Sequence, residues 1–224
     1  MNKKLVIITL SAAICMPSYS FAFGMGDITS GLGDITSSVT GSGGDNNIDD
    51  LEKGQGELAD ETNKVMLDFV TAFGVFSEAL GLEVDSSIKD EIANCGSGKI
   101  CTENELIEKI ESESSALIEA MKSKKDEGVK LSADASKTFQ KGLVPYGRGI
   151  LRGSALGLRI AEAGPKYISA VAANPLSASS TLATGMAITK QVPPVLSTFS
   201  TASGGIYDFA TYNGIEKPEE VEAE

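Results

Sequence analysis

Apolar residues recur at steps of three and four along the first half of the chain, and this spacing constrains the fold more than any other feature. Such steps place side chains on one face of a helix. No run of four or more residues alternates convincingly between apolar and polar, as a half-buried strand would. The sequence therefore predicts an all-α fold, a multi-helix bundle. The clearest stripe consists of Leu58, Val65, Phe69, Phe73, Phe76 and Leu80.

Local signals indicate where these helices begin and end. We expect the first helix to cover residues 51–80 and to end at Gly81, because glycine commonly follows the last helical residue. Asp85 is expected to cap a short second helix. The pattern of a capping box at Thr102–Glu105 predicts the start of a third helix. The polar run before Gly128 leaves open whether that helix continues through it.

Prolines in the second half predict that its helices are short. A proline inside a helix removes a backbone hydrogen bond and clashes with the preceding turn. We therefore expect helix breaks at Pro145, Gly164-Pro165, Asn174-Pro175 and Pro193-Pro194.

The start of the chain (residues 1–22) has the layout of a secretory signal peptide. Lys3 and Lys4 precede the apolar run Leu5–Ile14, and small residues lead to a cleavage position after Ala22. An apolar run this short does not span a bilayer as a helix. We expect cleavage near Ala22 and a periplasmic or secreted mature protein.

Export determines how the cysteines are interpreted. Cys15 lies in the predicted signal peptide, so the mature chain keeps Cys95 and Cys101. A pair of cysteines in an oxidising compartment usually forms a disulfide. The residues between them are rich in glycine and serine and can close a small ring. We expect a structural disulfide at the corner between the second and third helices.

Composition divides the mature chain into four segments. Residues 23–48 are rich in Gly, Ser and Asp and are expected to form a disordered arm. Residues 49–142 form an acidic helical half, and residues 23–142 together carry 11 positive and 24 negative charges. Residues 143–215 carry 5 positive and 2 negative charges and are rich in Ala, Gly and Ser. Residues 216–224 form a short acidic tail. The acidic half is expected to pack against the Ala/Gly-rich half.

The absence of histidine excludes much catalytic chemistry. The chain has no His and a net charge of -12. Without imidazole there is no Ser-His-Asp triad and no histidine-based zinc site. An acidic chain is also a poor partner for nucleic acid, because phosphate contacts need clustered Lys and Arg. We expect no nucleic-acid partner, no cofactor and no metal site, and paired carboxylates are the catalytic chemistry left open.

The most distinctive pattern is a row of glycines at intervals of four residues, beside an edge of arginines. Small residues at this spacing form a groove on a helix that admits another backbone closely. On a helical wheel the arginines fall within about 40° of one another, next to the glycines. The glycines are Gly149, Gly153 and Gly157, and the arginines are Arg148, Arg152 and Arg159.

These features favour an exported, non-catalytic helical protein with an interaction or structural role. We expect the glycine groove and its arginine edge to contact an unidentified protein partner or an anionic membrane surface. The structural alternative is that the glycines serve a tight internal helix crossing and the arginines pair with the acidic half. The sequence also allows two other functions. One is a membrane-associating or pore-forming-like protein that uses residues 143–207, and the other is a His-independent hydrolase that uses carboxylates. The sequence leaves the oligomeric state open.

Overall fold

The computed structural model describes residues 48–83, 85–101 and 104–216. The chain divides into two compact units, residues 1–43 and 44–224, and every described residue belongs to the second. The predicted signal peptide, the predicted arm before Ile48 and the predicted tail after Glu216 lie outside the described residues.

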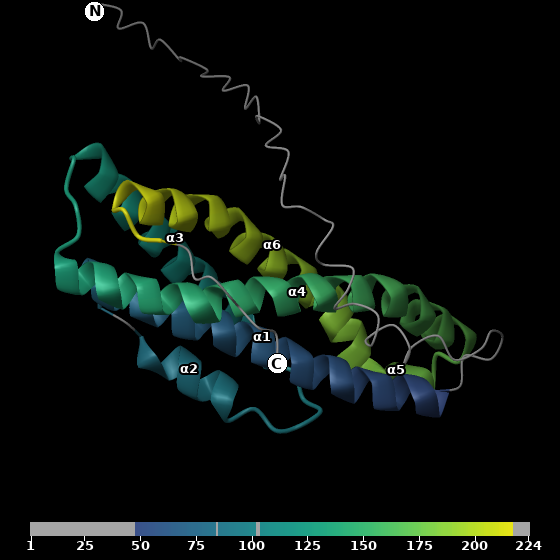
Figure 1. Cartoon of the computed structure of the whole chain (residues 1–224). Helices are drawn as coiled ribbons and strands as arrows, with labels where there is room; N and C mark the ends of the chain where they lie inside the picture. The colour runs from purple at the N-terminus through teal and green to yellow at the C-terminus, as the bar shows by residue number, and fades with distance from the viewer. Residues whose placement is uncertain (1–47, 84, 102–103, 217–224) are drawn as a thin grey trace, which may run out of the picture. The chain divides into compact units, whose positions relative to one another are not determined.

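The described part of the chain is all helical, which confirms the predicted fold class (Figure 1). No strand occurs among these residues. The helices are α1 (Ile48–Leu80), α2 (Ser86–Ala93), α3 (Asn104–Asp126), α4 (Ala133–Ala173), α5 (Ala178–Thr181) and α6 (Ala183–Tyr212).

Helices α1 and α4 form the centre of the bundle and run antiparallel, side by side (Figure 1). At one end, Phe76 of α1 lies so close to Gly142 of α4 that a Cβ atom on the glycine would be 2.6 Å from the ring. At the other end, the Tyr167 hydroxyl of α4 lies 3.4 Å from the Leu51 carbonyl of α1. Helix α6 packs against both, and α3 packs against α6 and α1.

Aromatic side chains fill the space between α1, α4 and α6. The rings of Phe69 and Phe199 stack with their centroids 3.9 Å apart. The buried Tyr146 hydroxyl donates to the Phe199 carbonyl at 2.7 Å and bonds with the Ser203 hydroxyl at 2.9 Å, so its polar atom is satisfied. Such rings contribute most of the apolar area of a small core. The cluster comprises Phe69, Phe73, Phe76, Phe139, Tyr146, Phe199 and Phe209.

The first two helices end and begin where local signals predicted. Helix α1 ends before Gly81, whose φ of 74° is a left-handed conformation that favours glycine. The Asp85 side chain accepts the Ser87 N–H at 2.9 Å and caps α2. Helix α1 begins at Ile48, slightly earlier than expected, so the last residue of the predicted arm is helical.

Helix α3 ends before Gly128 instead of continuing through it. Gly128 has a φ of 73°, and the Val129 N–H donates to the Lys124 carbonyl at 2.8 Å. This is the bonding of a glycine helix terminus. The predicted capping box at the start of α3 includes Thr102 and Glu103, which lie outside the described residues.

The expectation that prolines break the helices of the second half is wrong at all but one position. Pro145 and Pro165 lie inside α4, and Pro193-Pro194 lies inside α6, whereas Asn174-Pro175 does follow the end of a helix. Buried residues continue before and after each internal proline, so the packed face offsets the lost hydrogen bond. Pro165, Pro193 and Pro194 are exposed, so the disturbed turns lie on the solvent side.

The change in composition between residues 142 and 143 lies inside α4. The acidic segment 49–142 supplies nearly all of α1 together with α2, α3 and the start of α4. The segment 143–215 supplies the rest of α4 with α5 and α6, so the two segments share one helix.

Candidate functional site

The glycine row lies on the face of α4 that packs inside the bundle. A Cβ atom on Gly149 would lie 3.2 Å from the ring of Phe69, and one on Gly153 would lie 3.2 Å from a methyl group of Leu196. Gly157 is less crowded, with a Cβ position 3.8 Å from Leu196. Side chains of α1 and α6 therefore occupy the groove within the same chain.

The arginine edge faces acidic residues of α1. Asp68 is buried, with 7% of its side chain exposed, and it accepts Arg148 at 2.7 Å and Arg152 at 2.9 Å. Arg159, seven residues after Arg152 on α4, pairs with Glu61 of α1. A guanidinium matches a carboxylate in geometry as well as in charge. The three arginines thus tie α4 to α1.

All six of these predicted residues therefore lie on the same part of α4, and they contact α1 and α6 within the bundle. A partner helix that entered the glycine groove would have to displace Phe69 and Leu196. An anionic surface that bound the arginine edge would compete with Asp68 and Glu61. Among the interpretations of this pattern, the structural one accounts for these contacts directly.

The opposite side of α4 carries exposed apolar side chains. Leu158 is 57% exposed and Leu151 is 38% exposed, although both are large and aliphatic. Of the six such residues in the described part of the chain, five lie on α4 or in the loop after it. Three of those on the helix lie along one line, which we call the outer stripe: Val144, Leu151 and Leu158.

The spacing of the outer stripe is that of a helix seam. Val144, Leu151 and Leu158 are seven residues apart, so they follow one line along the helix. Ser154 and Ala161, each three residues after a leucine, are small and exposed. Large and small side chains therefore alternate along this face, as at the contact between two closely packed helices.

Charge on this side of α4 is mostly positive. Lys141 and Lys166 are exposed on the flank of the outer stripe. Beyond Asp134 in the first turn, Glu162 is the one acidic residue of α4, and it is exposed beside the stripe. The face is thus apolar along its centre, with sparse charges of both signs at its margin.

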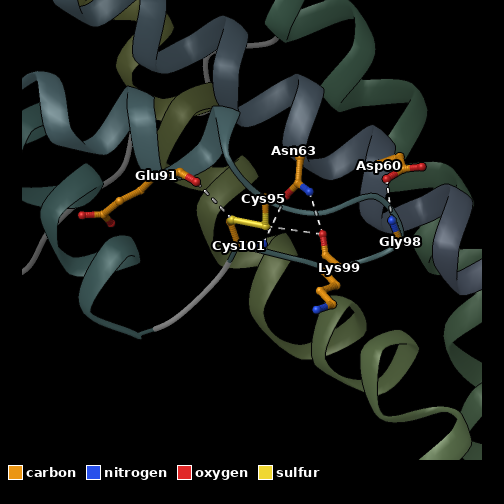
Figure 2. The surroundings of a disulfide bond; sticks show 7 residues. All are labelled: Asp60, Asn63, Glu91, Cys95, Gly98, Lys99 and Cys101. Atoms are coloured by element: carbon orange, nitrogen blue, oxygen red, sulfur yellow. Dashed lines mark hydrogen bonds between the residues drawn. A yellow bond between two sulfur atoms is a disulfide. The ribbon is translucent and has the colours of Figure 1, made fainter.

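A second predicted site, the cysteine pair, forms a disulfide between Cys95 and Cys101, with Cα atoms 5.9 Å apart. Figure 2 shows how the loop between them is bound to α1. The Gly98 N–H donates to Asp60 at 2.7 Å, and the Asn63 side chain donates to the Lys99 carbonyl at 2.7 Å.

The backbone bond from Gly98 holds the pKa of the Asp60 carboxyl below its usual value, with a smaller contribution from the Ser97 hydroxyl. Asn63 also accepts the Cys101 N–H at 3.2 Å. The disulfide therefore closes a loop that Asp60 and Asn63 of α1 bind through several hydrogen bonds, an arrangement that favours a structural role.

Other surfaces offer less chemistry. A depression of about 350 Å³ lies between α3 and α6. Apolar Ile118, Met121 and Phe209 line it together with charged residues that include the Lys125–Asp208 ion pair. Within the described residues, no group of three or more metal-ligating side chains comes together. None of the described helices is long and apolar enough to cross a membrane.

No family model, curated protein or solved structure matches this chain.

The outer stripe escaped the sequence analysis although its signal was present. The glycine row marks one face of α4, and the seven-residue spacing of Val144, Leu151 and Leu158 marks the other. An apolar line opposite a glycine groove indicates a helix with two packing faces. The glycine face packs inside this bundle, and the apolar line stays exposed.

Proposed function

We propose that this protein is an exported, non-catalytic interaction protein that binds a protein partner through the outer face of α4. The observation that supports this most is the gathering of exposed large apolar residues on that one helix. Exposed apolar patches that exceed scattered single residues mark interaction sites on soluble proteins.

The contacts on the inner face of α4 make it a rigid helix, which suits a binding surface. Its inner face is fixed by the contact of Gly149 with Phe69 and by the ion pairs of Asp68. A rigid helix presents its outer side chains in one arrangement, so little conformational entropy is lost when a partner binds. The glycine groove and the arginine edge then serve the function by holding the interaction surface in place.

Export is part of the proposal and rests on two features. Residues 1–22 have the layout of a signal peptide. The Cys95–Cys101 disulfide fits an oxidising compartment such as the periplasm or the cell exterior. Cell fractionation, with sequencing of the N-terminus of the mature protein, tests this directly; a cytoplasmic protein that keeps Met1 would contradict it.

Site-specific photocrosslinking in cells tests the interaction surface. A photoreactive residue at Leu158 should give covalent adducts, and the same residue at Glu108, exposed on α3, serves as the matched control. Adducts at Leu158 that are absent at Glu108 support the proposal. No adduct at either Leu151 or Leu158, or equal adducts at the control, would remove its basis.

An anionic membrane is the second candidate, favoured by Lys141 and Lys166 beside the outer stripe. Apolar residues flanked by lysines are typical of helices that lie on a lipid surface. The mature protein would then sediment with vesicles of phosphatidylglycerol at low salt, and Lys141→Glu with Lys166→Glu would abolish this. Binding to neutral vesicles at the same strength would contradict an electrostatic contribution.

A further inference from the structure

The outer face of α4 is complementary to itself. We infer that its partner is a second copy of this chain, with the two α4 helices packed antiparallel about a two-fold axis close to Ala155. This inference rests on the proposed function, because it uses the same surface and names its occupant.

The apolar residues set the register. In an antiparallel pair related by a two-fold axis, two positions face each other when they are equally far from the axis on opposite sides. Leu151 and Leu158 have their midpoint between residues 154 and 155, and Val144 and Pro165 have the same midpoint. One axis therefore places each leucine against the other leucine of the second copy, and each Val144 against Pro165.

The charges independently favour nearly the same register, with an axis half a residue away. Arg148 and Glu162 have their midpoint at residue 155, so each Glu162 would face Arg148 of the second copy. Arg148 keeps 38% of its side chain exposed while it is bonded to Asp68. A guanidinium has five N–H donors, so Glu162 of the second copy would share Arg148 with Asp68 and would not have to displace it. Glu162 is exposed and is the one acidic residue of α4 beyond its first turn.

A parallel pair lacks this agreement. It would bring Glu162 toward Glu162 and Arg148 toward Arg148 of the second copy, which places like charges together. The antiparallel register replaces both repulsions with attractions. Ala155 on the axis and the small residues Ser154 and Ala161 near it would let the two helices approach closely.

A two-fold pair also uses the surface economically. In a two-fold dimer the same patch is buried on both copies, so a self-complementary patch leaves no exposed apolar surface to bind further chains. An open, head-to-tail contact would leave one outer stripe exposed at each end. Among possible partners, a second copy is the one whose chemistry is already present on this chain.

Disulfide trapping of the purified mature protein (residues 23–224) tests the axis. Ala155→Cys introduces a single free thiol, because Cys95 and Cys101 are bonded to each other. Two such thiols would meet at the axis and form a covalent dimer under mild oxidation. Ser169→Cys is the matched control, since it is exposed on the same helix but about 42 Å from its copy in this register.

We expect the Ala155→Cys variant to give about tenfold more covalent dimer than the control, because the helix pair raises the local thiol concentration. Equal trapping at Ala155 and Ser169 would overturn the antiparallel register. Circular dichroism before oxidation confirms that both variants keep the helical fold.

Analytical ultracentrifugation between about 1 and 200 µM tests the dimer without a new thiol, over the range expected for a small interface. The native chain should be dimeric at high concentration, and Leu151→Glu with Leu158→Glu should be monomeric with unchanged helical content. Glu162→Lys should weaken the dimer while leaving the fold intact. A native chain that stays monomeric throughout this range overturns the inference.

The two proposals fail in different ways. If the chain stays monomeric but a photoreactive residue at Leu158 traps another protein, the proposed function holds and the second copy is wrong. If the chain stays monomeric and sediments with anionic vesicles, the occupant is lipid. If neither binding is detected and no adduct forms, both proposals are wrong.

Discussion

The ring of Phe69 occupies the space into which a side chain at Gly149 would project. A Cβ atom there would lie 3.2 Å from three atoms of the ring, which is closer than carbon atoms normally pack. The ring cannot move away freely, because it stacks on Phe199 on its other side with centroids 3.9 Å apart. The glycine therefore sets how closely α4 approaches α1.

Two glycine variants test this relationship. Gly149→Ala should lower the free energy of unfolding by about 1 kcal/mol, because overpacking outweighs the gain in helix propensity. Gly157→Ala should raise it by roughly 0.5–1 kcal/mol, since its Cβ would make an ordinary 3.8 Å contact with Leu196. Urea unfolding followed by circular dichroism measures both. Equal effects at the two positions would show that crowding by Phe69 does not matter.

The buried carboxylate of Asp68 should contribute strongly to stability. Asp68→Asn leaves the guanidinium groups of Arg148 and Arg152 without their shared negative charge, and both are partly exposed, which reduces the cost. We expect a loss of about 1–3 kcal/mol in the free energy of unfolding. Glu57→Gln is the control, because Glu57 is 54% exposed and lies 3.6 Å from Arg159. Its effect should stay within about 0.5 kcal/mol; a larger loss there than at Asp68 would contradict the assignment.

The helices that the sequence predicted well are those defined by local signals. Steps of three and four located the buried face of α1, and Asp85 and Gly81 marked nearby helix ends. Proline was misleading in α4 and α6, because its cost is local whereas the burial that offsets it comes from other helices. The burial around Pro145 depends on contacts with residues about seventy positions earlier in the chain.

The sequence predicted only part of the candidate site, because contacts between distant parts of the chain decide the rest. The spacing of Gly149, Gly153 and Gly157 predicted a close helix contact, and Gly149 and Gly153 lie close to side chains of α1 and α6. Spacing alone does not say whether the contacting helix belongs to the same chain, since α1 and a partner helix fit such a groove equally well. Once α1 and α6 fill it, the outer stripe is the face of α4 left to interact.

Removing the disulfide should destabilise the fold without changing it. Cys95→Ser with Cys101→Ser should lower the free energy of unfolding by roughly 2–2.5 kcal/mol, from the entropy of a seven-residue loop in the unfolded chain. Helical content should be unchanged, because Asp60 and Asn63 still bind the loop. Urea unfolding measures the loss. Mass spectrometry without reductant is the control, and two free thiols in the native protein would contradict the premise.

The protein should lose stability in alkali through its buried tyrosines. Burial raises the pKa of Tyr167 to about 12, from an unfolded value near 10, and raises that of Tyr146 further. Because each folded-state pKa is raised, the folded chain holds more protons than the unfolded chain above pH 10, and stability falls as pH rises. Each such proton contributes a slope of up to about 1.4 kcal/mol per pH unit. Urea titrations at intervals from pH 9 to about pH 12 measure the free energy of unfolding. We expect the tyrosines to change it little below pH 10. Tyr167→Phe should make the decline above pH 10 less steep. An equally steep decline in that variant would mean that Tyr167 does not carry the effect.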